Sequence, residues 1–265
     1  MTQIVWIASY PRSGNTWLRF LLGNLLLDKV ESSAQIASML PDIHRFVTGR
    51  HLLGPERSFI KTHWAWRADF PLRENTQAVV YLLRHPLDVV KSALNYAGRG
   101  AGDFMRDAGP AELDRFARNF VAEFANYGGN GGWYRQGFGT WAENVASWTE
   151  TALPFRRHVL RYEALRADPT RALAGIAQFL ELPVSPERIA TAVERSSLER
   201  LGAIEEEELR AEQPGLFYGR QSSKTREQGF RFIGGEDRRP LELTDDERVR
   251  LRERFAPAMA KLGYE

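Results

Sequence analysis

The chain of 265 residues contains no cysteine, which excludes disulfide bonds and thiol chemistry. It is also poor in lysine, because only five of its 36 basic residues are lysines, at positions 29, 61, 91, 224 and 261. The net charge of +2 is too small to hold nucleic acid by bulk electrostatics. We therefore expect no nucleic-acid partner.

Long apolar runs are absent as well. The most apolar stretch, Trp17 to Leu27, is interrupted by Arg19 and Asn24 and is shorter than the about 20 residues that a membrane-spanning helix needs. A predicted strand begins almost at once and no basic region precedes it, which is unlike a secretory signal peptide. We expect a cytoplasmic protein without a membrane partner.

Apolar runs typical of buried strands alternate with amphipathic patterns typical of helices. A helix is predicted after Asp168, whose side chain suits the cap position and which precedes a proline. This alternation predicts an α/β fold of three layers, with a central parallel sheet flanked by helices. The predicted strands cover residues 4–8, 58–63, 79–83 and 156–165.

Ligands of parallel sheets bind beyond the carboxyl ends of the strands. Three segments that follow predicted strands contain unusual polar residues, at 10–16, 61–66 and 84–92. Longer irregular segments lie near 96–140, where glycines alternate with aromatics, and near 205–240, which is basic and polar. Because such long loops are usually lids or binding loops, we expect one domain over residues 1–265 with mobile loops in these two places.

The first of the polar segments joins a strand to a helix. Backbone N–H groups at such a junction converge on one point, where the helix dipole favours an anion. A strand–turn–helix junction with a merely polar turn fits this segment equally well when it is taken alone. The residues that suit an anion are Arg12, whose planar fork matches phosphate or sulfate oxygens, Gly14, and the side-chain donors Ser13, Asn15 and Thr16.

Two motifs resemble one enzyme family, the sulfotransferases that use 3′-phosphoadenosine 5′-phosphosulfate (PAPS). Their 5′-phosphosulfate loop reads Tyr-Pro-Lys-Ser-Gly-Thr-Thr-Trp, and this chain has Arg12 for the lysine and Asn15 for the first threonine. Their 3′-phosphate motif, Arg-Asn-Pro-x-Asp-x-x-x-Ser, resembles the segment from Arg84 to Ser92, in which His85 replaces the asparagine. The resemblance implies a P-loop-like three-layer fold.

Shorter segments extend the resemblance to about Leu182. The "IKTHWAW" segment resembles the one that supplies the catalytic base of the family, here His63, and "VLRYEAL" resembles the one whose tyrosine faces the adenine, here Tyr162. Residues 139–150 resemble a helix of bacterial members, including those that act on glycopeptide antibiotics. The nucleotide-capping stretch near the C-terminus is represented only by "KTREQGFRFIGG", in which the candidate counterparts are Lys224, Arg226 and Gly229.

The resemblance implies transfer of a sulfuryl group from PAPS to a hydroxyl of a small molecule, with PAP as product. His63 would act as base, and Arg12 and Lys61 would stabilise charge. Trp17 would lie near the adenine or belong to the core. The residues implied in binding PAPS are Arg12, Ser13, Gly14, Asn15, Thr16, Trp17, Arg84, Ser92, Tyr162, Lys224, Arg226 and Gly229.

A small-molecule kinase that uses ATP is the alternative function. Such a P-loop enzyme would need a Gly-Lys-Ser/Thr loop and a magnesium ion, whereas this loop lacks the lysine–hydroxyl pair and no metal is expected. Monomer and homodimer are both compatible with the sequence. Aromatics that could line the acceptor pocket, or anchor loops to the core, are Trp64, Trp66, Tyr96, Trp133, Tyr134, Phe138 and Trp141.

Overall fold

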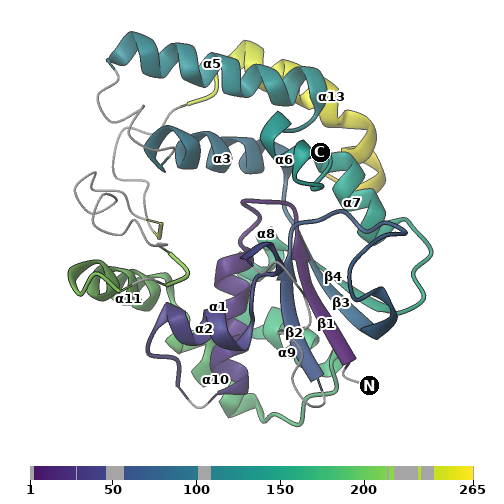
Figure 1. Ribbon diagram of the computed structural model, residues 1–265, viewed down its shortest axis with the longest axis vertical. Coiled ribbons are helices and arrows are strands. Elements are labelled where there is room, and N and C mark those ends of the chain that lie inside the picture. Colours follow the sequence, from purple (N-terminus) through teal and green to yellow (C-terminus); the bar gives the residue numbers. More distant parts are fainter. Residues whose placement is uncertain are drawn as a thin grey trace.

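A computed structural model describes residues 3–27, 29–45, 57–100, 109–213, 215–217, 232–233 and 242–264. Within this part of the chain, four parallel strands form one sheet in the order β2-β1-β3-β4. The predicted α/β fold with a central parallel sheet is therefore confirmed (Figure 1). The strands are β1 (Gln3–Ser9), β2 (Arg57–Thr62), β3 (Thr76–Leu83) and β4 (Arg156–Arg161).

Both faces of the sheet are covered by helices, which explains the continuous apolar runs in its strands. Alternate residues of β1 point to opposite faces, so Ile4 and Trp6 join one buried cluster while Val5 and Ile7 join the other. Helices α3 (Pro86–Gly100), α5 (Pro110–Tyr127), α7 (Trp141–Thr149) and α13 (Asp245–Leu262) cover the first face. Helices α1 (Asn15–Leu26), α9 (Pro169–Phe179) and α10 (Pro186–Arg195) cover the second.

A third apolar cluster joins α1 to two helices that lie beside it in Figure 1, α2 (Ser33–Met39) and α11 (Leu198–Arg210). Phe20 of α1 and Ile36 of α2 meet Leu201 of α11 in this cluster. The remaining short helices are α6 (Gly131–Arg135), α8 (Tyr162–Ala167) and the 3-10 turns η1 (Ile43–Arg45) and η3 (Arg73–Asn75).

The structure differs from the sequence-based prediction at two places. The strand expected over 156–165 ends at Arg161, because the next residues turn into α8 and bury Leu165 from that helix. Much of the segment near 96–140, expected as loop, is helical. In α5 the residues Ala117, Val121 and Phe124 form one buried stripe between charged positions.

The helix expected after Asp168 is confirmed as α9, and the side chain of Asp168 accepts a hydrogen bond from the Arg171 N–H at 2.9 Å. In the described ranges, none of the helices combines the length and the apolar character needed to span a bilayer.

Candidate active site

The loop between β1 and α1 has an unusual backbone. Arg12 and Gly14 both adopt left-handed conformations, with φ of 66° and 94°. A Cβ atom at position 14 would lie 2.6 Å from ring atoms of Tyr162, so glycine is required there for close approach as well as for φ. No side chain caps the start of α1 in the described structure, which leaves first-turn N–H groups directed into the loop.

Arg12 connects this loop to the second motif. Its Nε donates to Ser92 Oγ on α3 at 3.3 Å, and Nη1 of Arg84 donates to the Arg12 carbonyl at 3.0 Å. The guanidinium packs against two aromatic rings, 4.4 Å from the ring centre of Tyr96 and 5.1 Å from that of Phe232. Burial lowers the pKa of Arg12 to about 10, so the group stays charged at neutral pH. The two sequence motifs thus meet in space.

Tyr162 and Trp17 lie on the other side of the loop. The Arg84 guanidinium is 4.3 Å from the ring centre of Tyr162, at the start of α8. Trp17 meets Tyr162 edge to face, with ring centres 6.2 Å apart, and its indole N–H donates to the Ser196 carbonyl at 2.9 Å. Trp17 also packs against the core, so both roles considered for it from the sequence fit its position.

Buried polar atoms without a partner surround the loop. Among the described residues, Ser13 Oγ and Arg84 Nε are buried donors with no hydrogen-bond partner. Such groups are costly unless an acceptor arrives, so this pair fits a bound anion. The amide nitrogen of Asn15 donates to the Ile7 carbonyl and to Ser9 Oγ, both at 3.1 Å, at the end of β1, and its Oδ1 is buried without a hydrogen-bond partner among the described residues. Thr16 lies in the first turn of α1.

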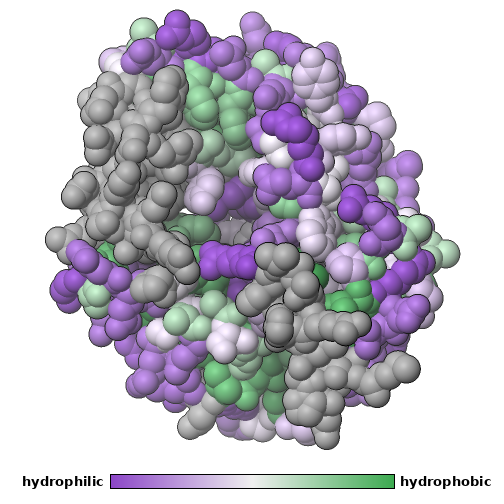
Figure 2. All heavy atoms as spheres, in the orientation of Figure 1, coloured by the Kyte–Doolittle hydropathy of each residue, from purple (hydrophilic) through white to green (hydrophobic). Residues whose placement is uncertain are grey.

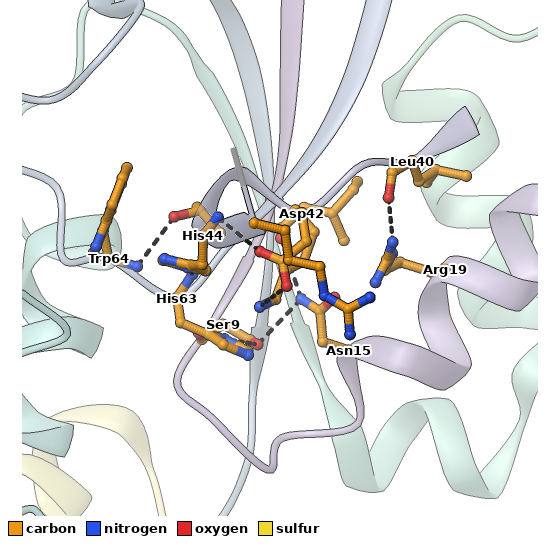
Figure 3. Close-up of polar contacts among 12 residues, drawn as sticks. Ser9, Asn15, Arg19, Leu40, Asp42, His44, His63 and Trp64 are labelled. Atoms are coloured by element: carbon orange, nitrogen blue, oxygen red, sulfur yellow. Dashed lines mark hydrogen bonds and ion pairs between the residues drawn. The ribbon is translucent and has the colours of Figure 1, made fainter. Parts of the chain in front are cut away.

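His63 follows the end of β2 and faces β1. Its Nδ1 lies 2.7 Å from the Ser9 carbonyl oxygen and 3.4 Å from Ser9 Oγ (Figure 3). A carbonyl oxygen can only accept, so Nδ1 carries the proton and Nε2 keeps a lone pair. Burial lowers the pKa of His63 well below 6.5, and the positive charge of Lys61 and the repulsion between the protonated forms of His63 and His44 lower it further. His63 is therefore a neutral base at neutral pH.

Lys61 lies near the end of β2, two residues before His63. Its Nζ forms a buried ion pair with Asp42 Oδ2 at 2.9 Å. Burial lowers the pKa of Lys61 to about 8, against the opposing effect of Asp42. Burial raises the pKa of Asp42, but the charges of Lys61 and the histidines outweigh it and hold this pKa well below its usual range. Sequence reasoning missed Asp42 as the partner of Lys61.

His44 was missed as well. Its Nε2 accepts the backbone N–H of His63 at 2.8 Å, and the two imidazole rings stack with centres 5.8 Å apart. The backbone N–H of His44 donates to Asp42 Oδ1 at 3.0 Å. Both residues lie in a segment that reads as a polar helix, and their spacing from His63 has no recognisable pattern. Their contacts arise from packing of η1 against β2.

Helix α7 holds the main chain around His63. The Asn144 amide donates to the carbonyls of His63 and Phe138, at 2.9 and 2.7 Å, and its oxygen accepts from the Tyr81 hydroxyl at 2.8 Å. The indole N–H of Trp148 donates to the Trp64 carbonyl at 2.9 Å. Side chains of α7 thereby hold the carbonyls of both His63 and Trp64, the two residues that follow β2.

The aromatic candidates divide between site and core. Phe138 packs on His63 and His44, and Trp64 packs edge-on against His44. Trp66 and Trp141 are buried against other core aromatics. The others are Tyr96 over Arg12, Trp133 against Tyr10, and Tyr134 on the surface.

Figure 2 shows a hollow in the surface. It lies between helices α3 and α5 on one side and the part of the molecule that contains α1 and α11 on the other.

Three predicted nucleotide-capping residues, Lys224, Arg226 and Gly229, lie outside the described residues. The ranges that are described hold no cluster of three or more histidine, aspartate or glutamate side chains suited to a metal ion.

Comparison with known proteins gives a consistent result. The family model of the sulfotransferase domain matches residues 2–263. Mouse sulfotransferase 1B1 is 27% identical over 214 residues, and the match covers 74% of this chain and 64% of that relative. Cytosolic sulfotransferase 8 of Arabidopsis thaliana is 25% identical over 232 residues, which cover 77% of this chain and 63% of that protein. The chain thus spans just under two thirds of the length of these relatives.

Similar folds occur in solved structures. Mouse sulfotransferase SULT7A1, complexed with PAP, has a TM-score of 0.66 at 21% identity, and the match covers 99% of this chain and 86% of that one. Retinol dehydratase, complexed with androsterone and PAP, has a TM-score of 0.57 at 19% identity, over 97% of this chain and 80% of that one. The sequence motifs, the fold and the family model agree, and the chain belongs to the sulfotransferase family.

Proposed function

We propose that this protein transfers a sulfuryl group from PAPS to a hydroxyl group of a small-molecule acceptor. The observation that supports this most is the meeting of Arg12, Arg84 and Ser92 at one loop, beside a histidine kept neutral with its Nε2 lone pair available. Two of the similar structures hold PAP, which is the product that PAPS leaves after transfer. When bound, the donor supplies an activated sulfuryl group.

The proposed nucleotide site uses hydrogen-bond donors of the β1–α1 loop and of the junction between β3 and α3. Arg84 and Ser92 are assigned to the 3′-phosphate, and Ser13 with the first-turn N–H groups of α1 to the 5′-phosphate. The rings of Tyr162 and Trp17 form the apolar wall proposed for the adenine. Gly14 permits close approach of the backbone. Lys224, Arg226 and Gly229 remain proposed contributors from the C-terminal part of the chain.

Proton transfer and charge stabilisation are assigned to separate groups. His63 Nε2 takes the proton of the acceptor hydroxyl, while its Nδ1–H stays bound to the Ser9 carbonyl. Arg12 stabilises charge on the transferring group, since its guanidinium is buried and charged. Lys61 adds its charge as one half of the ion pair with Asp42, so its contribution to charge stabilisation is smaller than that of Arg12.

We also propose that the protein is cytoplasmic, as the sequence predicts.

Aromatic side chains near His63 suggest the class of acceptor. Phe138 and Trp64 flank the two stacked histidines, which suits an acceptor with an apolar body. A second structure of retinol dehydratase, other than the androsterone complex described above, holds retinol and PAP. The kinase alternative is disfavoured, because the loop lacks the Gly-Lys-Ser/Thr sequence and Arg84 follows the end of β3, where such enzymes commonly place an acid.

Adenosine 3′,5′-bisphosphate is expected to stabilise the protein against heat without magnesium. A ligand at 100 times its Kd adds about 2.7 kcal/mol to the free energy of unfolding, which is a clear shift in Tm. The measurement is a melting curve with the bisphosphate, and with ADP and ATP in the presence and absence of magnesium. Stabilisation by magnesium-ATP alone would contradict the proposal and favour the kinase.

His63 is expected to remain neutral as the pH falls through 6.5. Its pKa is lowered well below that value, so protonation and loss of its base function occur only at more acidic pH. An NMR titration of the donor-free protein measures this directly, with the His63 resonance assigned by its absence in His63→Ala. A midpoint at or above 6.5 would contradict the burial and charge environment described above.

A further inference from the structure

The segment before η1 runs along the outer edge of β2. The N–H of Lys61 donates to the Pro41 carbonyl at 2.8 Å, and Asp42 and Lys61 form an isolated parallel bridge. This contact delivers Asp42 and His44 to the end of the strand where His63 begins. Figure 3 shows Asp42, His44, His63 and Ser9 gathered at this place.

The strand β2 ends at Thr62, so the N–H of His63 has lost its partner in the sheet. A half-buried N–H of this kind needs an acceptor. His44 supplies it through Nε2 at 2.8 Å, which requires the neutral tautomer with the proton on Nδ1. Burial, and then the charge of Lys61, lower the pKa of His44 to about 4, against the opposing effect of Asp42, and the acceptor is retained at neutral pH.

The ring of His44 also supports the ring of His63. The two rings are almost parallel, at 15°, and Phe138 packs against both with ring centres 5.0 and 5.7 Å away. The Ser9 carbonyl fixes the Nδ1 edge of His63 at 2.7 Å. His44 therefore restrains both the main chain and the ring of the proposed base.

We propose that His44 is a positioning residue, which aims Nε2 of His63 at the acceptor hydroxyl chiefly through its hydrogen bond to the His63 N–H, with its stacked ring as a lesser support. The inference rests on the proposed function. Asp42 serves this role indirectly, because its two oxygens bind the His44 N–H and the Lys61 ammonium, at 3.0 and 2.9 Å. The proposal involves no contact of His44 with PAPS or with the molecule that receives the sulfuryl group.

Three variants separate the hydrogen bond from the ring. His44→Phe keeps a stacked ring but has no hydrogen-bond acceptor for the His63 N–H. His44→Gln keeps a hydrogen-bond acceptor without the ring, and His44→Ala removes both. His158→Phe is the matched control, since His158 is partly buried on β4 and packs on Phe179. Each variant is first checked for native folding by circular dichroism and thermal melting.

Turnover is the first measurement. Because misplacement of a catalytic group by about 1 Å can cost about 100-fold, His44→Phe is expected to lower kcat by about 10- to 100-fold. The KM for the acceptor and the affinity for PAP should stay within about twofold, since the hydrogen bond of His44 is to the main chain. His44→Gln should recover most of kcat, and His158→Phe should behave as the native protein. Equal losses in the Phe and Gln variants, or a parallel loss of PAP affinity, would overturn the proposal.

NMR of the His63 imidazole is the second measurement, and it needs no activity. In the native and His44→Gln proteins we expect a slowly exchanging Nδ1–H resonance of His63, whereas in His44→Phe it should broaden or exchange rapidly. An unchanged resonance in His44→Phe would overturn the positioning role. Should the native protein fail to turn over PAPS, the proposed function falls while this measurement still decides the inference.

Discussion

Replacement of His63 by alanine is expected to lower kcat by about 10²- to 10⁴-fold, the range that a positioned general base contributes. Nδ1 of His63 is bound to the Ser9 carbonyl, which leaves only Nε2 to accept a proton. The side chains proposed to bind the phosphates, Ser13, Arg84 and Ser92, come from the β1–α1 loop, the residue after β3 and α3. The affinity for PAP, measured by calorimetry, should therefore change by less than about twofold in the same variant.

The control for this experiment is His158→Ala, which removes a histidine from β4 rather than from the end of β2. It should leave kcat near the native value. A parallel loss of turnover, PAP affinity and folded protein in His63→Ala would show a structural role for His63. That outcome is a real alternative, because the ring packs on His44 and Phe138.

Local motifs explain why the residues of the proposed donor site could be picked out from the sequence. Arg12 and Gly14 occur within one loop after a strand, and Arg84 and Ser92 occur within one strand–helix junction, so the spacing in the sequence already fixes much of their geometry. The parallel sheet then brings the two junctions together, and Arg84 reaches the Arg12 carbonyl across 72 positions. Alternating strands and helices predicted this sheet for the same reason.

Other features depend on tertiary packing and leave no local pattern. Asp42 and His44 meet Lys61 and His63 only because η1 packs on the edge of β2. The side-chain amide of Asn15 lies in the anion-binding motif of the sequence, but in the structure it donates to the Ile7 carbonyl near the end of β1. Helix α5 was missed although Ala117, Val121 and Phe124 follow the i, i+4, i+7 spacing of an amphipathic helix, because the glycine-rich segments on both sides of it indicated a loop.

Replacement of Arg84 by glutamine is expected to weaken the binding of PAP by about 10- to 140-fold, since a hydrogen bond to a charged group contributes about 1.5–3 kcal/mol and 1.4 kcal/mol is tenfold. The Nε of Arg84 is buried without a partner in the described structure, which suits a donor to a phosphate oxygen. Adenosine 5′-phosphate has a 3′-hydroxyl in place of the phosphate. Its affinity, measured by the same calorimetry, should change by less than about threefold.

Arg161 offers a matched control on the neighbouring strand. Like Arg84 it ends a strand and lies over a tyrosine, with its guanidinium 4.6 Å from the ring centre of Tyr264. Its hydrogen bonds go to the carbonyls of Leu262 and Gly263 near the C-terminus, away from the β1–α1 loop. Arg161→Gln should therefore leave both nucleotides unaffected. If Arg84→Gln weakened both nucleotides equally, Arg84 would act through the Arg12 carbonyl and the Tyr162 ring, and the 3′-phosphate would need another partner.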